Sequence, residues 1–143
     1  MTPLGGWERT LECVRAALDH KAYDLVVLET GRASSIADYF VICSGRSDTQ
    51  VQSIAEGVEE HLRRHGERPL SVEGLPHAQW VLIDYGDVVV HVFYVPLRGF
   101  YDLERLWVRA PRVELPEPFQ SQARSQKTGT EGRRRRAERP GCG

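Results

Sequence analysis

The chain has 143 residues, of which 41% are hydrophobic, 8% aromatic and 27% charged, and its formal net charge is −1. A chain of this length can bury the core of one ordinary domain without disulfides or metal ions to hold it together. No apolar run approaches the roughly 18 residues of a membrane span. These quantities exclude a membrane protein, a disulfide-framed secreted module and a fully disordered chain.

The spacing of apolar residues predicts helices and strands that alternate along most of the chain. One helical stripe, with spacings of three and four, consists of Leu4, Trp7, Leu11, Val14 and Leu18. Strands are predicted over residues 24–30, 36–43, 69–72, 79–85 and 88–95. Further helices are predicted over residues 47–62 and 100–108. The order, roughly α-β-β-α-β-β-β-α, predicts an α/β fold in which a small mixed β-sheet packs against helices.

The second predicted helix has clear start and stop signals. Ser47 and Gln50, three residues apart, form a capping-box pattern, and Gly66 suits the position just after a helix. The segment Ser44-Gly45-Arg46-Ser47 would also suit a phosphate site, because helix N-termini attract anions. It lacks the glycine patterns of nucleotide-binding loops, so a turn with an N-cap is the favoured interpretation.

The predicted hairpin, joined at Tyr85-Gly86-Asp87, allows its two faces to be assigned. With a two-residue connection, alternation predicts one shared face for Trp80, Leu82, Asp84, Val89, His91 and Phe93. The opposite face is almost purely aliphatic, so we expect it to lie under the helices. The shared face mixes aromatic with polar side chains, which is typical of interface hot spots rather than of a domain interior.

Charge divides the chain into two regions. Residues 1–116 carry 12 Lys and Arg against 17 Asp and Glu, a net charge of −5, whereas residues 117–143 carry 7 against 3, a net charge of +4. The second region has almost no apolar residue after Phe119, so we expect a disordered basic tail behind a domain that ends at residue 116. A solvated tail is the favoured interpretation, and an electrostatic contact between the arginine run 133–136 and RNA is the alternative.

The residues that could carry chemistry form no recognisable catalytic constellation. We expect free thiols at the three widely spaced cysteines, Cys13, Cys43 and Cys142. Asp84 and Asp87 could be interpreted as a metal-binding carboxylate pair, but they suit hairpin-turn chemistry better. We therefore expect no enzyme activity, no cofactor and no catalytic or resident metal.

The histidines divide into two groups. Four of them fall at predicted helix ends or in loops and are expected to be solvated: His20, His61, His65 and His77. His91 differs, because it lies inside a predicted strand near Trp80. A structural role and a binding role for His91 both remain open at this point.

A series of motifs spans roughly residues 9–110: Ala37 to Ile42, Ser44-Gly45, Gln50-Val51, Glu73-Gly74, Trp80 to Asp84, Val90 to Phe93, Arg98, Tyr101 and Leu103 to Trp107. In content and order this series resembles the ribosomal silencing factor family, also called the Iojap family. The resemblance implies a small α/β domain similar to nucleotidyltransferases but without their catalytic carboxylate set.

The resemblance also implies a function in translational control. Members bind the large ribosomal subunit through its ribosomal protein number 14 and sterically prevent the small subunit from joining, which represses translation. Organellar relatives are linked to large-subunit assembly, which is one alternative. Carried over to this sequence, the resemblance implies these partner-binding residues: Trp80, Asp84, His91, Arg98, Tyr101, Leu103, Glu104 and Trp107. Leu103 and Trp107, four residues apart, could instead simply pack onto the sheet, and for Trp107 this packing role is the favoured interpretation.

Other classes of protein fit the sequence less well. A nucleotidyltransferase-like enzyme would need a carboxylate trio that the sequence does not supply. A direct RNA-binding module would need a basic face, yet residues 1–116 are acidic. The first stretch contains Glu8 and Glu12 and resembles neither a secretory signal nor an organellar transit peptide, so we expect a bacterial cytoplasmic protein. A homodimer remains an open alternative that no sequence feature requires.

Overall fold

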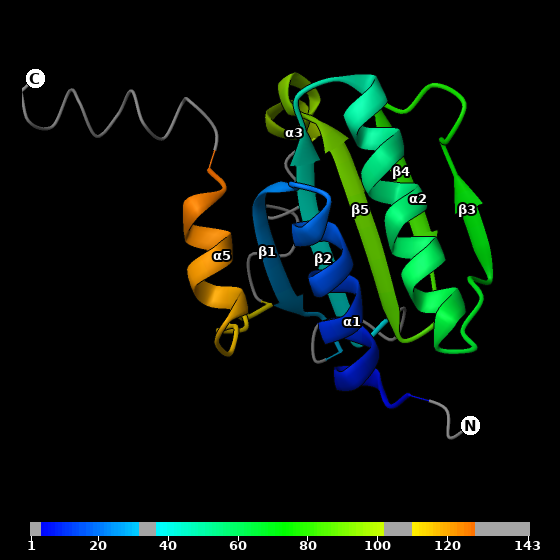
Figure 1. Ribbon diagram of the computed structural model, residues 1–143, viewed down its shortest axis with the longest axis vertical. Coiled ribbons are helices and arrows are strands. Elements are labelled where there is room, and N and C mark those ends of the chain that lie inside the picture. Colours follow the sequence, from blue (N-terminus) through cyan, green and yellow to red (C-terminus); the bar gives the residue numbers. More distant parts are fainter. Residues whose placement is uncertain (1–3, 32–36, 102–109, 128–143) are drawn as a thin grey trace, which may run out of the picture.

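The computed structural model describes residues 4–31, 37–101 and 110–127, with backbone alone for residues 99–101 (Figure 1). Its elements in chain order are α1 (Gly6–Asp19), β1 (Tyr23–Glu29), β2 (Tyr39–Gly45), α2 (Asp48–Arg64), β3 (Ser71–Glu73), β4 (Trp80–Asp84), β5 (Val88–Tyr94), α3 (Val95–Tyr101) and α5 (Phe119–Ser125). Within the described ranges, no helix has the length and apolar character needed to cross a bilayer.

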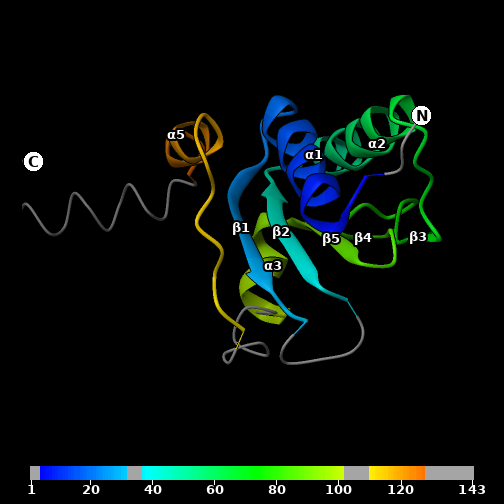
Figure 2. The ribbon, with the colours of Figure 1, turned by 90° about the horizontal axis from the view of Figure 1, so that it is seen from below.

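The strands form one mixed sheet, as the sequence predicts. The five strands lie in the order β1-β2-β5-β4-β3; β2 and β5 run parallel, and the other neighbours run antiparallel. Helices α1 and α2 cover one face of the sheet, and α3 lies on the other side (Figure 2). The predicted α/β class with a small mixed sheet is therefore confirmed.

The register of the hairpin agrees with the prediction from alternation. Trp80 pairs with Phe93, Leu82 with His91, and Asp84 with Val89. Tyr85 donates its backbone N–H to the Val88 carbonyl at 2.9 Å, which leaves Gly86 and Asp87 as a two-residue turn. Gly86 has φ of +95°, a conformation that suits glycine.

The aliphatic face of the sheet forms the main core with the two long helices. Val81, Ile83, Val90 and Val92 are fully buried there. They belong to one cluster with apolar side chains of α1 and α2, including Val14, Leu18, Ile54, Val58 and Leu62. Cys13 and Cys43 lie in the same cluster as buried free thiols, and burial raises the pKa of both.

The ends of several elements differ from their predicted limits. Ser47 accepts the backbone N–H of Gln50 at 3.0 Å, which confirms the predicted N-cap. The Gln50 side chain bonds instead to the Arg46 N–H and the Lys21 carbonyl, so the reciprocal half of the capping box is absent. Helix α3 occupies residues just after the predicted strand end at Pro96, a proline that fits the first turn of a helix, where no N–H bond is required. The helix predicted over residues 100–108 falls almost entirely outside the described residues.

An ion-pair group ties the start of α1 to two distant loops. Arg9 donates through Nε to Glu67 at 2.8 Å and through Nη1 to Asp87 at 2.6 Å, and its Nη2 bonds to the Leu4 carbonyl at 2.8 Å. The Arg9 side chain is only 12% exposed. Its hydrogen bond holds the pKa of the Glu67 carboxyl below the usual range. Asp87 belongs to the β4–β5 turn, so this group also fixes the turn that sets the hairpin register.

The prediction that the chain is disordered after residue 116 is wrong for residues 117–127. Residues 111–113 pair with β1, since Val113 donates to the Val27 carbonyl at 2.8 Å. After this pairing the chain forms α5, which packs against α1 and β1. Phe119 and Ala123 of α5 are 6% and 8% exposed. Arg15 also lies over the Phe119 ring, 4.9 Å from its centroid. Two apolar side chains four residues apart are sufficient for docking, although they form too short a stripe to predict a helix. Residues 128–143 lie outside the described residues.

Truncation tests this revised boundary. A chain that ends at residue 127 should retain nearly the full free energy of unfolding, because the removed residues 128–143 carry few apolar side chains. A chain that ends at residue 116 should lose at least about 2 kcal/mol, as expected when a buried phenylalanine is removed. Urea unfolding measures the free energy of unfolding of both truncated chains. Phe119→Ala tests the buried side chain alone, and Ser121→Ala at an exposed position of α5 is its matched control. Equal stability of the two truncated chains would contradict the packing of α5.

Candidate partner-binding face

The face of the sheet turned away from α1 and α2 carries the candidate site. Cross-strand pairing places Phe40, Ile42 and Ser44 of β2 beside Val89, His91 and Phe93 of β5, and these beside Trp80, Leu82 and Asp84 of β4. We call these nine residues the aromatic face. Most of its apolar members form a second core cluster, separate from the one under the helices. The sequence-based division of the hairpin into two faces is thus confirmed.

Trp80 is held in place by its neighbours on the aromatic face. Its indole Nε1 donates to Nδ1 of His91 at 3.2 Å. Its ring stacks on Phe93 with centroids 5.1 Å apart and an interplanar angle of 24°. Trp80 itself is only half-buried. A large aromatic surface with a fixed orientation is therefore partly open to solvent.

His91 lies beneath Trp80 and is almost entirely buried, at 3% exposure. Because Nδ1 accepts the indole hydrogen bond, the assigned ring proton is on Nε2. Nε2 is buried with no hydrogen-bond partner among the described residues. Burial lowers the pKa of His91 to about 4, so the ring is neutral at physiological pH. Of the two roles left open by the sequence, this geometry favours the structural one: His91 orients Trp80.

Asp84 has a clear turn role. Its Oδ1 accepts the backbone N–H of Gly86 at 2.8 Å, which is the Asx-type bond of a tight turn. Asp87 is engaged by Arg9, so the two carboxylates serve the hairpin separately rather than as a metal-binding pair. Asp84 remains half-buried on the aromatic face, and no other hydrogen bond of its side chain occurs within the described residues.

Arg98 reaches the aromatic face from α3. Its Nη1 donates to Oγ of Ser44 at 3.0 Å, and Ser44 pairs with Phe93 at the end of the sheet. The Arg98 side chain is half-buried. The structure thus brings four of the predicted site residues to one side of the sheet: Trp80, Asp84, His91 and Arg98.

The other predicted site residues lie at or beyond the limit of the description. Tyr101 is the last residue of α3, and its side chain is not described. Leu103, Glu104 and Trp107 lie outside the described residues. Their roles stay predictions.

The aromatic face is less exposed than its composition indicates. On β5, Val89 is 5% exposed and Phe93 is fully buried, so this part of the face is interior rather than interface. Residues that flank the sheet, Ala37 and Ala110, belong to the same cluster. Among the nine residues, only the β4 side chains remain half-buried, which concentrates the accessible part of the face at Trp80, Leu82 and Asp84.

A polar cluster on the helix side was missed by sequence reasoning. His61, expected to be solvated, is 22% exposed and lies 2.6 Å from Oε1 of Glu12, and His65 lies 3.5 Å from the same oxygen. Burial works to raise the pKa of Glu12, but the His61 hydrogen bond and the nearby charges of Arg15 and His65 more than offset it, so the pKa is lowered. The four-residue spacing of the two histidines was the available signal.

Comparison with known proteins identifies the family of this α/β domain. A family model described as "Ribosomal silencing factor during starvation" matches residues 7–139. The ribosomal silencing factor RsfS of Bacillus subtilis is 45% identical over 106 residues, which are 73% of this chain and 90% of that protein. The chloroplastic protein Iojap of Arabidopsis thaliana is 32% identical over 115 residues, 80% of this chain and 48% of that protein.

Solved structures agree with the sequence matches. A crystal structure of a protein from Chromobacterium violaceum superposes with a TM-score of 0.72 at 33% identity, covering 73% of this chain and 88% of that one. A crystal structure of a protein from Bacillus halodurans gives a TM-score of 0.69 at 43% identity, covering 76% of this chain and 99% of that one. The chain belongs to the ribosomal silencing factor (RsfS/Iojap) family, whose role is not enzymatic.

The buried neutral His91 predicts a specific pH dependence of stability. Its pKa is about 4 in the folded state and about 6.5 when unfolded, so the unfolded chain binds the extra proton between these values. The contribution of neutral His91 to the free energy of unfolding is therefore complete above about pH 6.5 and is lost as the pH falls towards about 4. Between about pH 7 and pH 4.5, wild type should lose about 2 kcal/mol more unfolding free energy than His91→Gln.

Urea unfolding at several pH values measures this difference. The exposed-site variant His77→Gln is the matched control and should follow the wild-type pH profile. An identical profile for His91→Gln and wild type would contradict the buried, neutral state of His91.

Proposed function

We propose that this protein binds the large ribosomal subunit through its ribosomal protein number 14, in the bacterial cytoplasm, and sterically blocks joining of the small subunit. Membership of the ribosomal silencing factor family supports a ribosomal partner. The observation that carries the proposal is the fixed, half-buried Trp80 on a sheet face not covered by α1 or α2. Repression of translation follows directly from blocked subunit joining.

The proposed contacts follow from the chemistry of the face. Trp80 offers a rigid aromatic surface, the kind of side chain that dominates binding energy at protein interfaces. Asp84 offers a carboxylate to a basic partner, and residues 1–116 as a whole carry a net charge of −5, which favours association with a basic surface. Arg98, anchored on Ser44, adds a positive charge at the edge of the same face.

The remaining contacts belong to the segment after α3. We assign Tyr101, Leu103, Glu104 and Trp107 to the same partner surface, because the family resemblance of the sequence extends through these positions. His91 is assigned a positioning role, because its ring is buried under Trp80 and accepts the indole N–H.

Subunit association is the direct test of the proposal. Saturating wild-type protein should reduce the reassociation of isolated large and small subunits in sucrose gradients. Trp80→Ala should weaken large-subunit binding by at least about 2 kcal/mol, roughly thirtyfold, because it removes the aromatic anchor. Asp84→Lys should also weaken binding, since it replaces attraction to a basic partner with repulsion.

Matched substitutions on the helix side provide the controls. Trp7→Ala removes another half-buried tryptophan, and Asp19→Lys reverses another acidic charge at the exposed end of α1. Both should bind like wild type once circular dichroism confirms folding. Unchanged subunit reassociation with wild-type protein would overturn the proposed function. Equal losses for Trp7→Ala and Trp80→Ala would show that the aromatic face is not the contact surface.

A further inference from the structure

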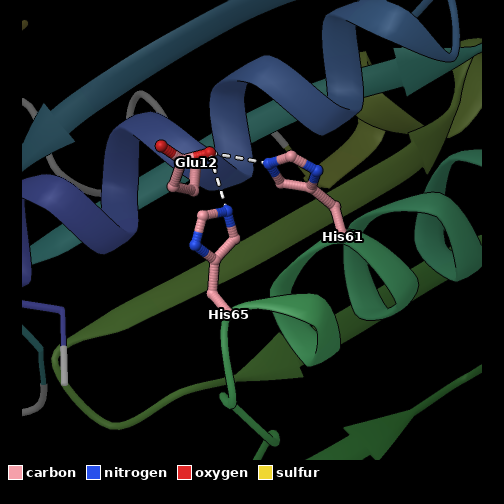
Figure 3. A group of neighbouring side chains, drawn as sticks. All are labelled: Glu12, His61 and His65. Atoms are coloured by element: carbon pink, nitrogen blue, oxygen red, sulfur yellow. Dashed lines mark hydrogen bonds and ion pairs between the residues drawn. The ribbon is translucent and has the colours of Figure 1, made fainter. Parts of the chain in front are cut away.

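Three metal-ligating side chains meet between α1 and α2, on the opposite side of the sheet from the aromatic face (Figure 3). Glu12 extends from α1, and His61 and His65 extend from the last turn of α2 and the residue that caps it. One ligand atom from each residue lies within 4.8 Å of the other two. The side chains of Glu12, His61 and His65 are 22%, 22% and 37% exposed, so an ion can reach them.

We propose that Glu12, His61 and His65 form a binding site for one divalent transition-metal ion, with Zn²⁺ as the best fit. Two imidazole nitrogens and one carboxylate oxygen are typical zinc ligands, whereas Mg²⁺ and Ca²⁺ prefer oxygen alone. The proposal is independent of the ribosomal function, since it concerns the helix side of the domain.

The two distances from Glu12 to the histidines are close to the ligand separations of a tetrahedral site. Ligand atoms about 2.0–2.1 Å from a zinc ion lie roughly 3.4 Å apart. Oε1 of Glu12 is 2.6 Å from Nε2 of His61 and 3.5 Å from Nε2 of His65. His61 and His65 are four residues apart, a spacing that places both rings on one side of α2. Small side-chain rotations therefore suffice to admit the ion.

The site is open to solvent on its His61 side. His61 lines an open groove of about 640 Å³ between α1 and α2, whereas Glu12 and His65 do not line it. Arg15 competes for the Glu12 carboxylate, with Nε 3.5 Å from Oε1. Its side chain is 47% exposed, and its guanidinium also lies over the Phe119 ring. Water fills the fourth position in the proposed complex.

A bound ion would link the two helices that cover the core. Glu12 belongs to the middle of α1, and the histidines lie at the end of α2. An ion that binds only the folded chain raises its stability in proportion to the logarithm of the metal concentration. Zinc should therefore raise the unfolding midpoint of the whole domain without changing the aromatic face.

Calorimetric titration of the untagged full chain with Zn²⁺ tests the proposal. We use a Cys142→Ser background, because that thiol could bind zinc elsewhere in the chain. One Zn²⁺ per chain should bind, the thermal midpoint should rise by several degrees and fall back with EDTA, and Mg²⁺ should have no such effect. Glu12→Gln and His61→Gln should each weaken zinc binding at least about tenfold. His77→Gln, an exposed histidine outside the cluster, should bind zinc as the parent does.

Histidine-ring NMR on the same parent chain gives an answer that does not depend on how the variants fold. Zinc should shift the ring signals of His61 and His65 while those of His77 and His91 stay in place. Absence of one-to-one zinc binding would overturn the proposal. So would zinc binding that leaves the His61 and His65 signals unchanged, or a loss of affinity in His77→Gln equal to that in His61→Gln.

Discussion

The two-residue turn between β4 and β5 is the constraint on which the rest of the structure depends. Side chains alternate along a strand, so a slip of one residue in this hairpin would exchange its two faces. Gly86 supplies the positive φ that the turn requires, and Arg9 holds Asp87 from the start of α1. With the register fixed, the aliphatic side chains lie under the helices, and Trp80 and Asp84 lie on the other side.

His91 connects the core to the accessible part of the aromatic face. It lies at the centre of the sheet, where an imidazole must remain neutral because burial disfavours the charged form. Its hydrogen bond to the indole of Trp80 directs a half-buried ring that would otherwise be free to rotate. A buried polar group of this kind costs stability unless it is satisfied, and the Nε2 atom without a partner in the described chain shows that the cost is only partly offset.

The two sides of the sheet carry different chemistry, which the fold keeps apart. The aromatic face presents Trp80 and Asp84 beside the second core cluster, with Arg98 at its edge. The helix side brings Glu12 and His61 together across α1 and α2. Because the fully buried main core lies between them, a substitution at one site should leave the geometry of the other unchanged.

Local patterns in the sequence predicted most of the fold. Alternation in residues 79–95 was sufficient for the hairpin register, because it depends only on neighbouring residues and a short turn. The docking of α5 could not be predicted, since Phe119 is buried by α1 and β1, far away in the sequence. The burial of His91 likewise depends on neighbouring strands, which a single-strand pattern does not reveal.

The candidate site was predicted only in part, because its contacts between distant segments leave no local pattern in the sequence. Motif resemblance selected Trp80, Asp84, His91 and Arg98, and the strand register explains why the first three share a face. The anchoring of Arg98 on Ser44 depends on α3, which starts at Val95. The sequence did not predict this helix, because Pro96 indicates the end of a strand as well as it fits the first turn of a helix. The contact between Glu12 and His61 joins residues that are 49 positions apart, beyond the reach of any local pattern.

Photo-cross-linking to the large subunit tests the central claim most directly. Ser71 is exposed and pairs with Asp84, so a photoreactive side chain at this position extends from the edge of the aromatic face. Gln52 is exposed on α2 and provides the matched position on the helix side. We expect a cross-link from position 71 to ribosomal protein number 14 and none from position 52. Cross-linking from position 52 but not from position 71 would contradict the assignment of the aromatic face as the ribosome-binding surface.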